Sequence, residues 1–202
     1  VTKEELEAMD AMSLKCAQEL SDAHVDVMGY ACLVAIMSMG RGYHCVSEVN
    51  LHQETIANDF PTPIVTSAGA LINGLKVLGA KQISIITPYM RPLTDMVVDY
   101  IEHQGIKVKQ SIALEIPDNL EVAAQNPMNL LEIYKQLDLT DVDVLVASAC
   151  VQMPSLEAID LIQAECGIPV TSAAVCTTYE MMKKLNIEPK SAIGGELLSG
   201  KY

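Results

Sequence analysis

The sequence predicts an α/β protein made of two pseudo-symmetric halves, each built on a parallel sheet. Three observations point to this fold class. Apolar runs of strand length alternate with segments of helical spacing along most of the chain. Two pairs of short segments recur in the same order. With 202 residues, half of them apolar, the chain can also bury a substantial core.

The chain is predicted to begin with a helix. Thr2, Lys3, Glu4 and Glu5 fit a capping box, in which Thr and Glu side chains three residues apart satisfy the first amides. Apolar residues then recur at helical spacing to about Ser21.

Strands and helices alternate through the rest of the chain. The predicted strands are 25–31, 63–66, 82–87, 107–114, 142–148 and 168–171. The predicted helices are 67–78, 90–104, 128–137, 154–164 and 173–184. This alternation is typical of βα units in parallel sheets, where ligands bind at the carboxyl ends of the strands.

An internal repeat relates the two halves. ACLV at 31–34 matches ACVQ at 149–152, and PIVTSAGAL at 63–71 matches IPVTSAAVC at 168–176. In each of the two longer segments a strand ends in Val-Thr-Ser-Ala and opens a helix. The repeated order indicates a duplicated half-domain.

The repeat also suggests domain boundaries. We assign residues 1–65 plus 173–202 to the first half and 66–172 to the second. Two βα units precede Cys150 in the second half, whereas one helix precedes Cys32 in the first. If the halves are true duplicates, roughly forty residues are missing before Val1. The N-terminal strands of the first half are therefore expected to be absent from this chain.

Two polar segments follow predicted strand ends. Residues 39–62 are glycine-punctuated and come directly after the Cys32 strand, so we predict a loop placed to act as a lid. Residues 115–127 hold the equivalent place at the mouth of the second half.

Charge and hydropathy limit the partners. A net charge of −13, with no basic cluster, argues against nucleic acid and anionic membranes. No apolar run is long enough to cross a bilayer, and the charged start lacks a signal-peptide pattern, so we expect a cytoplasmic protein. An anionic substrate would have to be held by local donors such as backbone amides.

Six cysteines lack any CxxC pair and are expected to be reduced. Cys16, Cys45, Cys166 and Cys176 are interpreted as small buried hydrophobic residues. Cys32 and Cys150 differ, because both follow a predicted strand end at matching positions of the repeat.

A pseudo-two-fold axis would set Cys32 and Cys150 across one cleft. A thiolate is a strong nucleophile and a competent base, and a helix starting just after it lowers its pKa. Donors predicted at the same mouth are the amides of Leu33, Val34, Val151 and Gln152 and the side chains of Tyr89 and Asn119. Tyr89 could instead pack at a helix entrance, and Asn119 could be a turn or cap residue.

Other polar residues receive structural interpretations. No metal site is expected, because the spacing of His44, His52, Glu48 and Glu54 matches no standard motif. Ser67 and Ser172, each followed by a helical pattern, are expected to cap helices.

These motifs resemble the aspartate/glutamate racemase superfamily, and within it the bacterial maleate cis-trans isomerases. The matching segments are GYACLVAIMSMG around Cys32, VTSAGAL, ITPY at Tyr89, IPDNLEV at Asn119 and SACVQMPSL around Cys150. The resemblance covers essentially the whole chain. It implies two flavodoxin-like parallel-sheet halves, a cleft between them with one cysteine from each half, and no cofactor. Related decarboxylases work with a single cysteine.

The resemblance implies that Cys32 is the nucleophile and Cys150 its partner, with Tyr89 and Asn119 as carboxylate donors. Maleate would become fumarate through a covalent succinyl-cysteine intermediate, in which the former double bond rotates. A homodimer or higher homo-oligomer and a place in nicotinate degradation are also expected. The family further uses an asparagine in an N-terminal segment that this chain lacks.

Two alternatives remain from the sequence. A racemase of amino-dicarboxylates would exchange a Cα proton between two opposed cysteines, but no clear partner for its ammonium group is visible. A non-catalytic binder of small dicarboxylates could use the same scaffold, because fold does not fix function.

Overall fold

The computed structural model describes residues 3–202, and it contains two parallel sheets. The strands are β1 (Met28–Tyr30), β2 (Ile64–Thr66), β3 (Gln82–Thr87), β4 (Lys107–Ala113), β5 (Val144–Ser148) and β6 (Val170–Ser172). Strands β1 and β2 pair in parallel, and the larger sheet has the parallel order β4-β3-β5-β6. Within the described residues, the first sheet has two strands and the second has four, as the sequence predicted.

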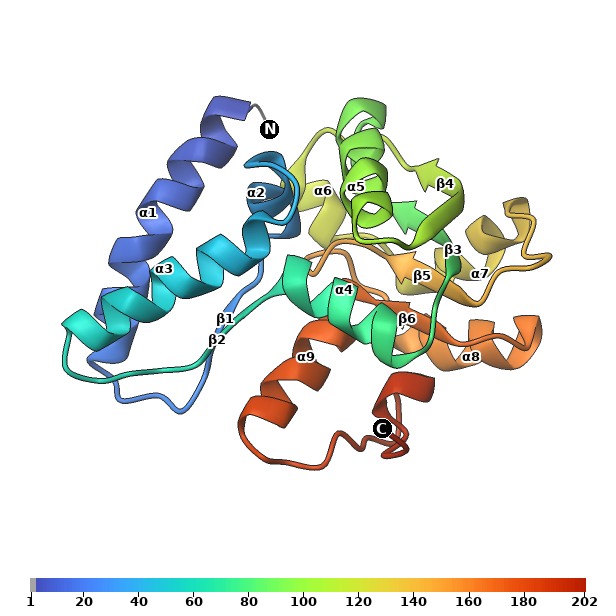
Figure 1. Cartoon of the computed structure of the whole chain (residues 1–202). Helices are drawn as coiled ribbons and strands as arrows, with labels where there is room; N and C mark the ends of the chain where they lie inside the picture. Colours follow the sequence, from blue (N-terminus) through green and yellow to red (C-terminus); the bar gives the residue numbers. More distant parts are fainter. Residues whose placement is uncertain (1–2) are drawn as a thin grey trace.

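Helices surround both sheets. They are α1 (Lys3–Ser21), α2 (Leu33–Ser38), α3 (Tyr43–Ala57), α4 (Ser67–Val77), α5 (Arg91–His103), α6 (Asn119–Ala123), α7 (Leu130–Ile133), α8 (Leu156–Cys166) and α9 (Ala173–Lys184). Three 3₁₀ turns are η1 (Pro127–Asn129), η2 (Tyr134–Gln136) and η3 (Glu196–Leu198). Figure 1 shows α5 above the larger sheet, α8 below it, and α1 and α3 side by side next to the smaller sheet. The predicted α/β fold class is confirmed.

Helices α4 and α9 pack against each other between the two sheets (Figure 1). They are the two helices of the VTSA repeat, and each starts at the residue after its strand. Gly74 permits the close contact, because a Cβ there would lie 2.6 Å from Cys176 Sγ. The predicted boundaries at 65/66 and 172/173 fall at this seam, and the division into halves remains a prediction.

The capping residues differ in the two copies of the repeat. Ser172 Oγ accepts the Val175 amide at 3.2 Å, as predicted. In the first copy the cap is Thr66, whose Oγ1 accepts the Gly69 amide at 3.1 Å. The prediction for Ser67 is therefore wrong, and its buried hydroxyl has no partner among the described residues.

The predicted lid loop at 39–62 is wrong, because most of it forms α3. The buried face of α3 consists of His44, Ser47, Leu51 and Thr55, which recur at helical spacing. Three of these four residues are polar, so the hydrophobic pattern did not reveal the helix. His44 Nδ1 lies 2.6 Å from the Tyr100 hydroxyl, which ties α3 to α5.

Two other predictions are modified. The predicted helix at 128–137 is divided into η1, α7 and η2. The opening helix is present as α1, but its predicted cap, Thr2, lies outside the described residues. Within residues 3–202, no helix is both long and apolar enough to span a membrane.

Candidate active site

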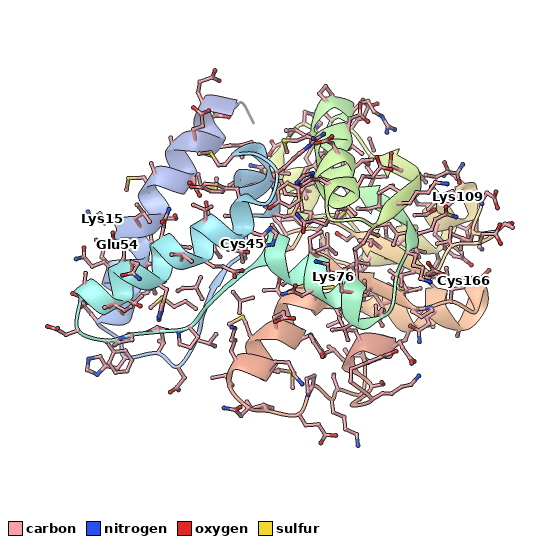
Figure 2. All side chains as sticks on the ribbon, in the orientation of Figure 1. Lys15, Cys45, Glu54, Lys76, Lys109 and Cys166 are labelled. Atoms are coloured by element: carbon pink, nitrogen blue, oxygen red, sulfur yellow. The ribbon has the colours of Figure 1, made fainter. Side chains whose placement is uncertain are left out.

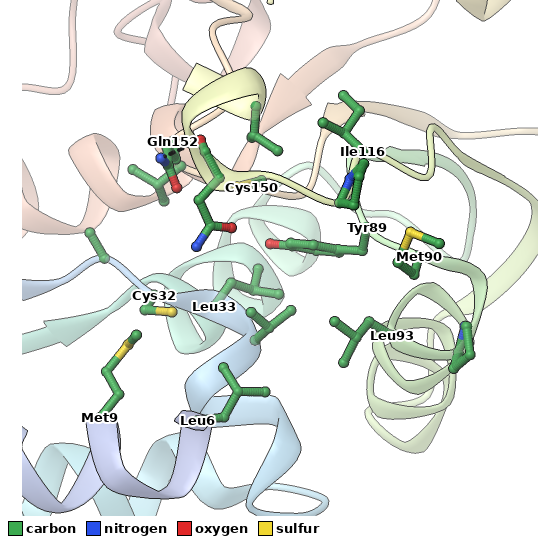
Figure 3. Close-up of a pocket in the computed structure, with 17 residues that line it drawn as sticks. Leu6, Met9, Cys32, Leu33, Tyr89, Met90, Leu93, Ile116, Cys150 and Gln152 are labelled. Atoms are coloured by element: carbon green, nitrogen blue, oxygen red, sulfur yellow. Dashed lines mark hydrogen bonds between the residues drawn. The ribbon is translucent and has the colours of Figure 1, made fainter. Parts of the chain in front are cut away.

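A cavity of about 520 Å³ lies where the carboxyl ends of strands from both sheets meet. It is lined by all eight residues predicted for the site, namely Cys32, Leu33, Val34, Tyr89, Asn119, Cys150, Val151 and Gln152. In Figure 3 the Cys32 sulfur, the Tyr89 ring and the Gln152 amide point into the same space. The two halves of the sequence therefore meet at one pocket, while the roles of these residues remain predictions.

Parallel strands place three of the side chains in the same way. Cys32, Tyr89 and Cys150 each come two residues after the last residue of a strand, β1, β3 and β5 respectively. The strand then gives way to a turn or a helix, so each side chain leaves the sheet at its carboxyl edge. This shared position explains why residues far apart in sequence converge.

Ser148, the last residue of β5, fixes the backbone at Cys150. Its hydroxyl donates to the Cys150 carbonyl at 2.9 Å and accepts the Cys150 amide at 3.3 Å. Ser148 is fully buried and Cys150 is largely buried, so these bonds are shielded from competing water. The two bonds therefore restrain the backbone of the turn that carries the Cys150 thiol.

Cys32 occupies the N-cap position of α2, but its side chain makes no capping hydrogen bond. Burial raises the pKa of the Cys32 thiol above its ordinary value, and the nearby Cys150 raises this pKa further. The predicted lowering of the thiol pKa by the following helix is therefore wrong. The Ala35 backbone amide at the start of α2 lowers the pKa of Cys32, but burial has the larger effect.

Tyr89 closes the cavity beside Cys150. Its hydroxyl donates to the Ala149 carbonyl at 3.1 Å. Burial, followed by the proximity of Cys150 and Cys32, raises the pKa of Tyr89 well above its ordinary value. Tyr89 therefore remains a protonated, neutral donor at any pH at which the protein would work.

Asn119 and Gln152 connect the loop after β4 to the segment after Cys150. Gln152 Nε2 donates to the Asn119 carbonyl at 2.8 Å. Asn119 is the first residue of α6, and the cap of this helix is Asp118, whose carboxylate accepts the Leu120 amide at 2.7 Å. The alternative of Asn119 as a cap is therefore wrong, and its side chain is available to the cavity.

Several cavity residues were not predicted from the sequence. Leu6 and Met9 of α1 close one side, and Met90 and Leu93 close another (Figure 3). Helical spacing placed Leu6 and Met9 on the apolar face of a helix, but it could not show which surface that face would cover. None of the described residues that line the cavity is charged.

The remaining cysteines lie outside this cavity. Cys176 is buried between α4 and α9 as predicted, whereas Cys16 and Cys45 are exposed, so their predicted burial is wrong. Figure 2 shows Cys45 on α3 and Cys166 on α8, in different parts of the molecule. The exposure of Cys16 and Cys45 follows from their place on the solvent side of each helix.

Two of the residues considered as metal ligands, Glu48 and His52, make hydrogen bonds within the fold. Glu48 Oε1 accepts the Thr66 amide at 3.1 Å and the Thr66 hydroxyl at 2.8 Å. His52 Nδ1 lies 2.7 Å from the Thr62 carbonyl oxygen. In the part of the chain that the structure describes, no group of three or more His, Cys, Asp or Glu side chains is arranged to hold a metal ion.

Comparison with known proteins places this chain in a family. The sequence profile of the arylmalonate decarboxylase family matches residues 2–198. A maleate isomerase of Geobacillus stearothermophilus is 56% identical over 202 residues, which are 100% of this chain and 80% of that protein. The chain belongs to the maleate isomerases. The family resemblance read from the sequence motifs is thereby confirmed.

Solved structures of maleate isomerases have the same fold. A cysteine-to-alanine variant of the maleate isomerase Iso from Pseudomonas putida S16, solved with maleate, matches with a TM-score of 0.98 and 59% identity over 100% of this chain and 81% of that one. A Nocardia farcinica cis-trans isomerase, a cysteine-to-serine variant with a covalently bound succinylcysteine intermediate, has a TM-score of 0.95 and 38% identity over 100% of this chain and 82% of that one. The α/β architecture described above is thus the architecture of maleate isomerases.

Proposed function

We propose that this enzyme isomerises maleate to fumarate without a cofactor, through a covalent succinyl-cysteine intermediate made by Cys32 and completed by Cys150. The convergence of both cysteines on one cavity is the observation that carries the proposal. The succinylcysteine found in the Nocardia farcinica enzyme supports it, because that intermediate formed in a variant lacking one cysteine. One thiol is therefore enough for the covalent bond there, and the second has another task.

In the proposed reaction, the Cys32 thiolate adds to one alkene carbon of maleate while Cys150 donates a proton to the other. The carbon–carbon double bond becomes a single bond and can rotate. Cys150 then removes a proton from the same carbon, the carbon–sulfur bond breaks, and fumarate leaves with the trans double bond. The thiolate and the proton that add to maleate are both removed when fumarate forms, so the reaction needs neither an oxidant nor a reductant.

The cavity lacks charged side chains among the described residues, so neutral donors have to hold the two substrate carboxylates. We assign this task to Tyr89 and Asn119 and to the amides of Leu33, Val34, Val151 and Gln152. Hydrogen bonds from such donors are strong in a site that excludes water. The donors are already oriented, so they need not reorganise when negative charge develops beside a carboxylate. Tyr89 would exchange its bond to the Ala149 carbonyl for one to the substrate.

The resting state of Cys32 constrains the first step. Because burial raises the pKa of Cys32, most of this thiol is protonated near neutral pH. Cys32 therefore has to release its proton to the solvent before its thiolate adds to the alkene carbon. A pair of free thiols also requires reducing surroundings, so we retain the expected cytoplasmic location as part of the proposal.

The test follows the alkene protons of maleate by NMR, with protein and buffer and no added cofactor. Fumarate should appear with the unchanged protein and not with Cys32→Ala or Cys150→Ala. Cys45→Ala is the matched control, because Cys45 is an exposed cysteine outside the cavity. Persistence of maleate with the unchanged protein, or full activity in either cavity variant, would overturn the proposal.

A further inference from the structure

A second cavity, of about 430 Å³, lies next to the candidate active site, and the proposed reaction does not use it. Val151 lines both cavities. The residues that follow it, Met153, Pro154 and Ser155, line only the second. The segment leading away from Cys150 therefore forms a wall shared with this second space.

One end of the second cavity has an unused hydrogen-bond donor. The Ser155 side chain lines the cavity, its residue is only 4% exposed, and it makes no hydrogen bond with any described residue. Ser155 stands at the N-cap position of the 11-residue helix α8, but its hydroxyl does not cap that helix. The Ser155 hydroxyl is not among the fully buried, unpartnered side-chain atoms of the described residues, so it is open to the cavity and free to bond a ligand there.

Two further features of the lining favour an anionic ligand. The first amides of α8 are not satisfied by a capping side chain, and a helix N-terminus attracts anions. Lys190 also lines the cavity, and its ammonium group makes no ion pair within residues 3–202. Glu157 in the first turn of α8 opposes this field, but it does not line the cavity.

Most of the remaining lining is apolar, although Ser172, Thr178 and Ser191 also contribute to it. Its walls include Met153, Val175, Met182, Ile193 and Leu198. Lys190 is the one charged side chain among the described residues of the lining, so the cavity matches one negative charge, and its apolar walls match a short hydrocarbon chain. A dianion would leave its second charge without a cation, which is unfavourable.

We propose that this second cavity binds a small monocarboxylate, with the carboxylate at Ser155, Lys190 and the start of α8 and the alkyl chain among the methionines. Occupancy restrains residues 151–155, which continue directly from Cys150. A bound monocarboxylate should therefore change the catalytic step at Cys150 without competing with substrate in the first cavity.

Methionine methyl NMR can test this proposal with butanoate as the probe. In protein labelled with ¹³C at the methionine methyl groups, Met153 and Met182 report on the second cavity and Met9 and Met90 on the first. Butanoate should shift the Met153 and Met182 signals in a saturable way and leave those of Met9 and Met90 in place. This binding measurement does not depend on whether the chain isomerises maleate.

Variants identify the contacts. Ser155→Ala and Lys190→Gln should each weaken butanoate binding at least tenfold. Ser67→Ala is the matched control, because Ser67 is also a buried serine without a partner but lines neither cavity. Unchanged affinity in both Ser155→Ala and Lys190→Gln would overturn the proposal, as would shifts confined to Met9 and Met90 or shifts that never saturate.

Kinetics give a second readout for the active protein. Saturating butanoate should lower kcat for maleate by at least twofold with little change in KM, and Lys190→Gln should remove this effect. A rise in KM alone would show competition in the first cavity and would contradict a separate site.

Discussion

The Ser148 hydroxyl holds the Cys150 backbone on both sides, donating to its carbonyl at 2.9 Å and accepting its amide at 3.3 Å. No other hydrogen bond of the described residues reaches the Cys150 backbone. The position of this thiol in the cavity thus depends on one buried side chain at the end of β5.

Replacing Ser148 by Ala should therefore lower kcat about tenfold, because the turn that aims Cys150 loses both bonds. A net loss of about 1 kcal/mol per hydrogen bond is typical, so the protein should still fold. Steady-state kinetics with maleate measure the effect, and circular dichroism checks the fold.

Ser84→Ala is the control for this experiment. Ser84 is also a fully buried serine on a neighbouring strand, but its hydroxyl has no partner among the described residues. Its removal should leave kcat unchanged. If both variants lose activity equally, the loss reflects general damage to the sheet rather than the aim of Cys150.

The raised pKa of the Cys32 thiol predicts a pH dependence with a definite sign. Below that pKa only a small fraction is thiolate, and this fraction grows about tenfold per pH unit. We therefore expect kcat/KM to rise from pH 7 to pH 9 rather than to level off near neutrality. A plateau that begins below pH 8 would contradict the direction given by burial.

Alkylation rates can separate the two causes, burial and the proximity of Cys150, that raise the pKa of Cys32. The proximity of Cys150 contributes to the raised pKa of Cys32. In Cys150→Ala, the rise in the rate at which iodoacetamide alkylates Cys32 should therefore occur at a lower pH. The displacement should be partial, because burial is the larger cause and remains in the variant. Mass spectrometry of the Cys32 peptide measures the rate at each pH.

Tyr89→Phe should lower kcat/KM for maleate at least tenfold, because the cavity loses a neutral donor that the proposed reaction needs for a carboxylate. The shape of the pH profile should stay the same. Tyr89 has a pKa well above its ordinary value and does not ionise in the working range. A profile whose rising limb moves in Tyr89→Phe would assign the titration to Tyr89 instead of Cys32.

Where local patterns were strong, the sequence predicted the fold and the convergence of the candidate site residues on one cavity. Cys32, Tyr89 and Cys150 follow apolar strands, and a parallel sheet brings such positions to one edge. The internal repeat correctly indicated two sheets. The place of α1 over the cavity could not be predicted, because the apolar face that holds Leu6 would fit any apolar surface.

The failures have physical causes as well. Helix α3 was missed because three residues of its buried face, His44, Ser47 and Thr55, are polar. His44 and Thr55 make hydrogen bonds at positions where most helices have apolar contacts. The pKa of Cys32 was misjudged because burial depends on the tertiary structure, and its effect exceeds that of the local Ala35 amide. Both errors arise from long-range packing that no local pattern records.

The seam between α4 and α9 gives a final prediction about stability. A Cβ at Gly74 would lie 2.6 Å from Cys176 Sγ and 3.2 Å from Cys176 Cβ, so Gly74→Ala forces the two helices apart. Overpacking of this kind costs about 1–3 kcal/mol of the free energy of unfolding. Denaturant unfolding followed by circular dichroism measures this cost.

Cys176→Ala supplies the matching half of a double-mutant cycle. It removes the sulfur that clashes with the new methyl group, so the double variant should lose less stability than the sum of the two single variants. Additive losses would show that the cost of Gly74→Ala arises elsewhere. Because α4 and α9 are the helices of the VTSA repeat, non-additive losses would show that their contact at Gly74 sets the stability of the seam between the two sheets.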